Sequence, residues 1–279
     1  RLKVRFDAVG FVLSGFSLAG FMYGVEILSK DGVSYFYSLL IVGFSLLLLW
    51  FNVRYSRHVS HPLIDYSVMK INSYKVTILT GSVSRMIIGV FPYLVPLMFQ
   101  EGFGLNPFES GLLFLSTMVG NLSMKSLTVW IMHRFRFRTI LIVNGCFSAL
   151  FTFFTALLMP TTPVYVIVLV LFTAGLFRSL QFSSLTTLAF TDTPASQTTA
   201  ANTLYSTVQQ MSTGMGIAMG AVVLRFSNII NHGIAGHYTV PDFRLAFIFV
   251  TILGFIHLYG YTKLSKDAGS VVMLKKKMF

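Results

Sequence analysis

Two arginines lie deep inside long apolar runs, where a charged side chain is costly. Arg85 lies within residues 75–99 and Arg178 within residues 164–190, each at least ten residues from either end of its run. At the centre of a membrane-spanning helix an arginine costs about 2.5–3.5 kcal/mol on insertion scales, which makes it a functional candidate. Neither has an acidic partner inside an apolar run; the nearest candidate, Glu26, lies at the outer end of the run 8–28, where the alternative is that it faces the external surface. We therefore expect each to pair with a helix outside this sequence or to line a cavity that binds anionic groups. The structural alternative is donation to backbone carbonyls.

Polar side chains repeat at helical spacing in two of the apolar runs. Gln181 and Ser184 follow Arg178 at intervals of three residues, which places them on one helix face. The next run carries a stripe that steps by four, three and four residues: Asn202, Ser206, Gln209 and Thr213. We predict that Arg85, Arg178, Gln181, Asn202 and Gln209 line a central cavity. The alternative is a set of interhelical hydrogen bonds, each worth about 0.6–2 kcal/mol.

Three further cations lie near the ends of apolar runs. Lys125 is only eight residues from His133, so its long stem can extend to water, and we favour this position over a role in the cavity. Arg134 and Arg138 lie in the connection between two runs, where they are placed to contact anionic lipid headgroups.

These residues belong to a chain with the composition of a membrane protein. Of its 279 residues, 54% are hydrophobic and 11% charged, and the mean hydropathy is +0.74, whereas a soluble domain has about a quarter charged residues. Eight runs are long enough to cross about 30 Å of hydrocarbon. They span residues 8–28, 34–53, 75–99, 109–132, 139–158, 164–190, 198–224 and 243–262. We predict an all-α membrane protein with eight transmembrane helices.

The sequence also excludes several classes of function. A single cysteine leaves no disulfide framework and no cysteine-based metal site. The chain has no GxxxxGKS phosphate loop, no HExxH metal motif and no TVGYG-like filter. We therefore expect neither an enzyme nor a bound metal or cofactor. The net charge of +12 indicates orientation in a lipid bilayer, not nucleic-acid binding.

Lysine and arginine gather on one side of the predicted membrane. The opposite side carries only Lys30, Arg225 and Arg244, while acidic residues show no such bias. Because cytoplasmic loops are enriched in lysine and arginine, the basic side is predicted to be cytoplasmic and to hold both termini of this chain. It contains Arg1, Lys3, Arg5, Arg54, Arg57, Lys70, Lys75, Arg134, Arg136, Arg138, Lys263, Lys266, Lys275, Lys276 and Lys277.

The longest cytoplasmic connection divides the predicted helices into two units. Residues 1–60 form a two-helix unit with a basic N-terminus, and residues 61–279 form a six-helix unit with a basic tail. From Pro62 onward apolar and charged residues alternate. The connection is either a helix in the headgroup region or a solvated loop.

Several longer strings resemble one transporter family. FDAVGFVLSGFSLAGFMYGVEIL resembles the first of two accessory helices in the 14-helix drug:proton antiporters of the major facilitator superfamily. HPLIDYSVMK is similar to the linker that enters their C-terminal bundle. YLVPLMFQEGFGLNPFESGLL, LFRSLQFSSLTTLAF and ANTLYSTVQQMSTGMGIAMGAVVL are similar to helices of that bundle. The resemblance implies that this chain is helices seven to fourteen, two accessory helices followed by the C-terminal six-helix bundle, and that an N-terminal six-helix bundle is missing.

The family's cytoplasmic signature is only partly kept. Its counterpart is VWIMHRFRFR, which retains Arg134 and Arg138 as cations. Val129, His133 and Arg136 stand where the signature has glycine, an acid and glycine. The resemblance thus implies a gating or lipid-contact role for this loop, and the departures weaken the gating part of it.

The resemblance implies proton-coupled export of amphipathic drugs by alternating access in a bacterial inner membrane. The proton gradient supplies the energy, and the expected partners are the lipid bilayer, a small-molecule substrate and the missing bundle. The unpaired arginines keep an anionic or zwitterionic substrate open. Alternatives are an organic-anion transporter of the same fold, and a non-transporting membrane subunit or decayed fragment.

Overall fold

All eight apolar runs form helices in the computed structural model, which describes residues 7–28, 35–56, 58–59, 66–232 and 237–270. The prediction of an all-α membrane protein with eight spans is confirmed, and no strand occurs in these residues. The helices are α1 (Ala8–Leu28), α2 (Tyr35–Ser56), α3 (Asn72–Leu97), α4 (Pro107–Arg134), α5 (Phe137–Ala156), α6 (Val164–Thr191), α7 (Thr198–His232), α8 (Val240–Ile256) and α9 (Leu258–Tyr261), with single turns η1 (Tyr66–Lys70), η2 (Met98–Gly102) and η3 (Ala195–Gln197).

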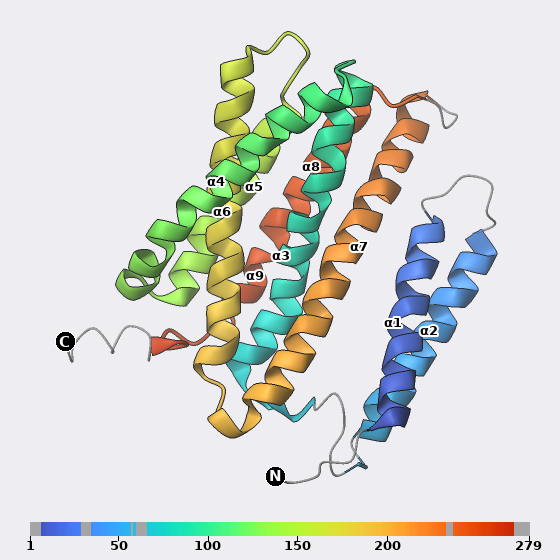
Figure 1. Cartoon of the computed structure of the whole chain (residues 1–279), viewed down its shortest axis with the longest axis vertical. Helices are drawn as coiled ribbons and strands as arrows, with labels where there is room; N and C mark the ends of the chain where they lie inside the picture. The colour runs from blue at the N-terminus through green and yellow to red at the C-terminus, as the bar shows by residue number, and fades with distance from the viewer. Residues whose placement is uncertain (1–6, 29–34, 57, 60–65, 233–236, 271–279) are drawn as a thin grey trace.

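Successive long helices run in opposite directions (Figure 1). The C-terminal ends of α2, α4 and α6 lie toward the lower end of the view, and those of α3, α5 and α7 lie toward the upper end. The connections therefore alternate between two ends, as crossing a bilayer eight times requires. The basic clusters at residues 1–5 and 275–277, on which the predicted orientation also depends, lie outside the described residues.

Most helix boundaries lie within three residues of those predicted by hydropathy, and two differ by more. The seventh helix continues to His232, eight residues beyond the predicted end at 224. Hydropathy falls at Arg225, but Ser227 and Asn228 are fully buried, so packing extends the helix past the apolar run. The last span breaks at His257, between α8 and α9. Of the predicted headgroup segment, residues 61–65 lie outside the described residues, and Tyr66–Lys70 forms a 3-10 turn.

The first two helices form a hairpin beside the seventh. Inside the hairpin, the Asn52 side-chain amide donates to the Ser14 hydroxyl at 2.6 Å. α1 also contacts α7, where Met22 lies against Gly214. A polar bond between two apolar helices is stabilising because no water competes for it in hydrocarbon.

Glycines allow two helix pairs to approach at backbone distance. A Cβ on Gly120 would overlap the carbonyl oxygen of Phe172, and a Cβ on Gly175 would overlap that of Thr117, so α4 and α6 touch through their backbones. At the α3–α7 crossing, a Cβ on Gly216 would overlap the Met86 carbonyl oxygen. Small residues at such crossings are the usual means of close helix packing in membranes. These two crossings fix the walls of the cavity described below.

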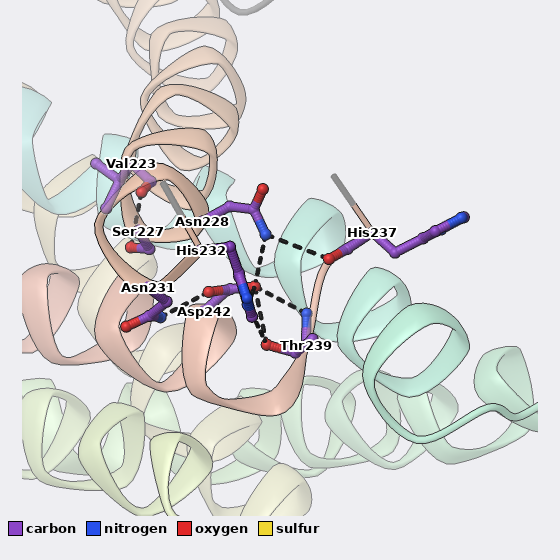
Figure 2. A network of polar contacts seen from close by, with 8 residues as sticks. All are labelled: Val223, Ser227, Asn228, Asn231, His232, His237, Thr239 and Asp242. Carbon is purple, nitrogen blue, oxygen red and sulfur yellow. Dashed lines mark hydrogen bonds and ion pairs between the residues drawn. The ribbon is translucent and has the colours of Figure 1, made fainter. Parts of the chain in front are cut away.

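A buried carboxylate joins α7 to α8 at the end opposite the basic loops (Figure 2). Asp242 is fully buried and accepts from the Thr239 backbone N–H at 2.9 Å and from the Thr239 hydroxyl at 3.0 Å. Two amides from α7 also donate to it, Asn228 at 2.8 Å and Asn231 at 2.6 Å. The His232 imidazole lies 3.4 Å away. One carboxylate thus caps α8 and holds the end of α7.

Replacing Asp242 by alanine is expected to destabilise the protein by about 2–3 kcal/mol, because it leaves several buried donors without an acceptor. Thermal unfolding of the purified full-length protein in detergent measures the effect. The control is Asp267→Ala, since Asp267 is exposed and its removal is expected to change stability by less than about 0.5 kcal/mol. Equal unfolding temperatures for the two variants would contradict a structural role for Asp242.

Candidate functional site

A cavity of about 640 Å³ lies between α3, α4, α6 and α7. This volume is within the range of small-molecule sites, which is about 300–1,000 Å³. Aromatic and sulfur-containing side chains form much of the wall: Phe91, Phe114, Met118 and Phe182. Hydroxyls and one amide are set among them: Thr117, Asn121, Ser179, Ser183, Thr186 and Thr187. The mixture suits a compound with a large apolar body and a few polar groups.

Arg178 reaches this cavity from α6 and is only partly bonded. Its side chain is 4% exposed. One terminal nitrogen, Nη2, lies 3.4 Å from the Thr152 hydroxyl, and the guanidinium lies over the Phe91 ring. Nε and Nη1 have no hydrogen-bond partner among the described residues. A desolvated guanidinium with two free nitrogens is unfavourable, so this position has donors available for a ligand.

Lys125 lines the same cavity from α4. It belongs to a face that also carries Thr117 and Asn121 at intervals of four residues, and all three border the cavity. The Ser179 hydroxyl donates to the Asn121 carbonyl oxygen at 2.8 Å, which links this part of α4 to the helix of Arg178. From the sequence we expected the Lys125 side chain to extend toward water; in the structure it is exposed and borders the cavity that Arg178 also lines.

The cavity is electropositive. Among the described residues that line it, two carry a positive charge, Arg178 and Lys125, and none is an aspartate or glutamate. Arg178 is buried, so its charge acts more strongly than it would in water, whereas Lys125 is exposed. The cavity therefore favours a negatively charged group over a positively charged one.

Arg85 lies elsewhere in the interior. It is 1% exposed, donates from Nη1 to the Thr77 carbonyl oxygen at 3.2 Å and places its guanidinium 4.6 Å from the centre of the Tyr205 ring. Nε and Nη2 have no partner among the described residues. Arg85 is not among the residues that line the large cavity. The two arginines predicted to line one cavity thus occupy separate places in the structure.

Gln181 faces a second, much smaller space. Its Oε1 accepts from the Asn144 side-chain amide at 2.8 Å. With Ser84 and His257 it borders a cavity of about 20 Å³, enough for about one water molecule. The Ser84 hydroxyl lies 2.7 Å from both His257 Nε2 and the Tyr261 hydroxyl. His257, which is alone in its span by sequence, is therefore part of a polar network that joins α3, α5, α6 and the last span.

The predicted stripe on α7 is largely open. Asn202 is exposed and Gln209 is half-buried, and neither is among the residues that line the large cavity, the small one or the basic groove described below. Thr213, the last residue of the stripe, borders the large cavity.

The loop between α4 and α5 carries a basic groove of about 280 Å³. Arg136, Arg138 and Lys266 line it together with apolar residues of α5. Arg138 Nη1 donates to the Leu264 carbonyl oxygen at 3.3 Å, which holds the end of the last span against α5. Arg134 is exposed and is not among the lining residues. No set of histidine, cysteine and carboxylate side chains suited to a metal ion occurs in the described part of the chain.

Sequence reasoning missed two features that have recognisable signals. The face with Thr117, Asn121 and Lys125 repeats every four residues, a helical spacing as clear as that of the predicted stripe on α7. Thr239 and Asp242, three residues apart with a proline between them, form a capping box at the start of α8.

Comparison with known proteins places the chain in a family. The model of the Major Facilitator Superfamily matches residues 6–218. A relative in Pectobacterium carotovorum subsp. carotovorum (strain PC1) is 28% identical over 223 residues, which cover 79% of this chain and 47% of the relative. A relative in Escherichia coli (strain 55989 / EAEC) is 23% identical over 277 residues, covering 98% of this chain and 58% of the relative. Both carry the name multidrug resistance protein MdtD.

The chain spans about half the length of the curated relatives it matches. The family match nevertheless covers most of the chain, and it agrees with the helical fold and with the cavity between α3, α4, α6 and α7. The chain is a multi-pass membrane protein that belongs to the Major Facilitator Superfamily.

Proposed function

We propose that the chain is part of a proton-coupled secondary transporter that exports amphipathic small molecules by alternating access. The observation that carries this proposal is the 640 Å³ cavity, whose wall combines aromatic side chains, hydroxyls and the partly bonded Arg178. Transporter sites lie near the bilayer midplane where one bundle rocks against another, and this cavity would be the part of such a site that this chain contributes. The name of the relatives, multidrug resistance protein, supports amphipathic drugs as the substrate class.

In this proposal, a second helical bundle of the full-length protein packs against this chain. The open stripe on α7, with Asn202 exposed and Gln209 half-buried, would face that bundle across the transport path. Residues 1–60 would form two accessory helices and residues 61–279 the C-terminal bundle. The protein would lie in a bacterial inner membrane with both ends of this chain in the cytoplasm, because the basic connections gather at one end of the helices.

Transport by the full-length protein in liposomes tests the proposal. With an imposed pH gradient, we expect movement of an amphipathic dye such as rhodamine 123 against its concentration gradient. A protonophore is expected to stop this movement. Dye movement that is absent, or that is indifferent to the protonophore, would contradict proton-coupled export.

A further inference from the structure

We propose that Arg178 and Lys125 form a binding site for an anionic group, a carboxylate or a comparable oxyanion, on the transported compound. The inference rests on the proposed transport function and specifies the chemistry of its substrate. It places the anionic group at the polar end of the cavity, with the apolar body of the compound against Phe114, Met118 and Phe182.

The first reason is the state of the Arg178 guanidinium. It is 96% removed from solvent, yet only one of its three nitrogens has a hydrogen-bond partner, and that partner is the uncharged Thr152 hydroxyl at 3.4 Å. A buried charge without a counter-charge is strongly disfavoured, so it is kept where a ligand supplies the missing interactions. The planar fork of a guanidinium fits the two oxygens of a carboxylate.

The second reason is the composition of the surrounding wall. Lys125 adds a second positive charge, and the described lining residues include no aspartate or glutamate that would neutralise either cation. The nearby hydroxyls and the Asn121 amide are able to donate to an oxyanion without adding negative charge. A cationic drug would meet two like charges in this wall, so it is expected to bind more weakly than a compound of the same shape that carries an anionic group.

The third reason is the rigidity of the two walls. Gly120 and Gly175 hold α4 and α6 in backbone contact, and Ser179 bonds to the Asn121 carbonyl oxygen across the same crossing. The two cations are thus mounted on helices whose separation is fixed, so a ligand group does not need to order them first.

Two dyes that differ only in one carboxyl group test the site. Rhodamine 110 has a free carboxylate, and rhodamine 123 is its methyl ester. Binding of each dye to the full-length protein in lipid nanodiscs is measured by fluorescence anisotropy. We expect rhodamine 110 to bind about tenfold or more tightly than rhodamine 123, as expected for one charge-assisted hydrogen-bond pair.

Three variants test whether Arg178 and Lys125 cause the preference for rhodamine 110 over rhodamine 123. Arg178→Gln is expected to abolish this preference, and Arg178→Lys is expected to retain part of it. Lys125→Gln is expected to reduce it several-fold, and because Lys125 is exposed in this chain the substitution does not disturb a buried residue. The matched control is Lys263→Gln, an exposed lysine outside the cavity, which is expected to leave the preference unchanged.

The outcomes separate the site from the transport function. Equal binding of the two dyes, or a preference that survives both Arg178→Gln and Lys125→Gln, would overturn the anionic site. Export of rhodamine 123 by the unmodified protein in the liposome experiment would leave the transport function intact. If neither dye binds or is exported, the transport function is overturned, and the anionic site with it.

Discussion

Replacing Arg178 by methionine is expected to weaken transport of a substrate with an anionic group by about tenfold or more, without lowering the stability of the protein. Methionine fills a similar volume but offers no donors, so the cavity loses its buried charge and keeps its shape. A charge-assisted hydrogen bond contributes about 1.5–3 kcal/mol, and its loss is expected to lower the apparent affinity for a matching ligand by about tenfold or more. Substrate-dependent transport in liposomes, at equal protein content, measures this loss.

The unfolding temperature of the same variant distinguishes a binding role from a structural one. Two nitrogens of Arg178 have no partner among the described residues, so methionine removes a desolvation penalty and breaks only one long hydrogen bond. We expect an unfolding temperature equal to or above that of the unmodified protein. A marked decrease, or normal transport at a normal protein level, would show that Arg178 serves the fold and not the ligand.

Adding one methyl group at Gly175 is expected to prevent normal packing of α4 against α6. The Cβ of Gly175→Ala would overlap the carbonyl oxygen of Thr117, a backbone atom that cannot move without displacing its helix. Overpacking of this kind costs about 1–3 kcal/mol or more. The level of folded protein in the membrane and its unfolding temperature in detergent report the effect.

A second glycine on the same pair of helices is the control. A Cβ on Gly111 of α4 meets no atom within 4 Å, and the residue is exposed. Because alanine favours helix over glycine by about 0.5–1 kcal/mol, Gly111→Ala is expected to be neutral or slightly stabilising. If both substitutions had the same effect, the close crossing of α4 and α6 would be wrong.

The helices themselves follow from the sequence because hydropathy is a local property. Each span needs about 20 apolar residues, and every run of that length became a helix. The end of α7 was missed because it depends on distant residues: Asn228 and Asn231 bond to Asp242, so the helix is held beyond its apolar run. Membership of the Major Facilitator Superfamily was predicted from longer strings and is confirmed. Its members are transporters and not enzymes, as expected.

The residues that share a cavity were harder to predict than the helices that carry them. Arg178 and Gln181 are three residues apart and point in directions about 60° apart. Because α6 is surrounded by neighbours, that angle is enough to direct one toward the large cavity and the other toward the small one. The distance of Lys125 from the loop does not indicate which way its side chain points around the helix axis. The glycine contacts between α4 and α6 determine that direction, and they arise only in the folded chain.

The most direct measurement is the reactivity of single cysteines on two adjacent positions of α4. Met118 borders the cavity, whereas Val119 lies one residue further, about 100° around the helix, and is not among the residues that line it. Cys146 and any other cysteine of the full-length protein are first replaced. A membrane-impermeant sulfonate thiol reagent is then applied to Met118→Cys and Val119→Cys.

Thiols react as thiolates, which form in water and not in hydrocarbon, so we expect Met118→Cys to react about tenfold or more faster than Val119→Cys. Bound substrate is expected to slow the reaction at 118 only. Equal rates at the two positions, with no effect of substrate, would contradict a water-accessible transport cavity between α3, α4, α6 and α7.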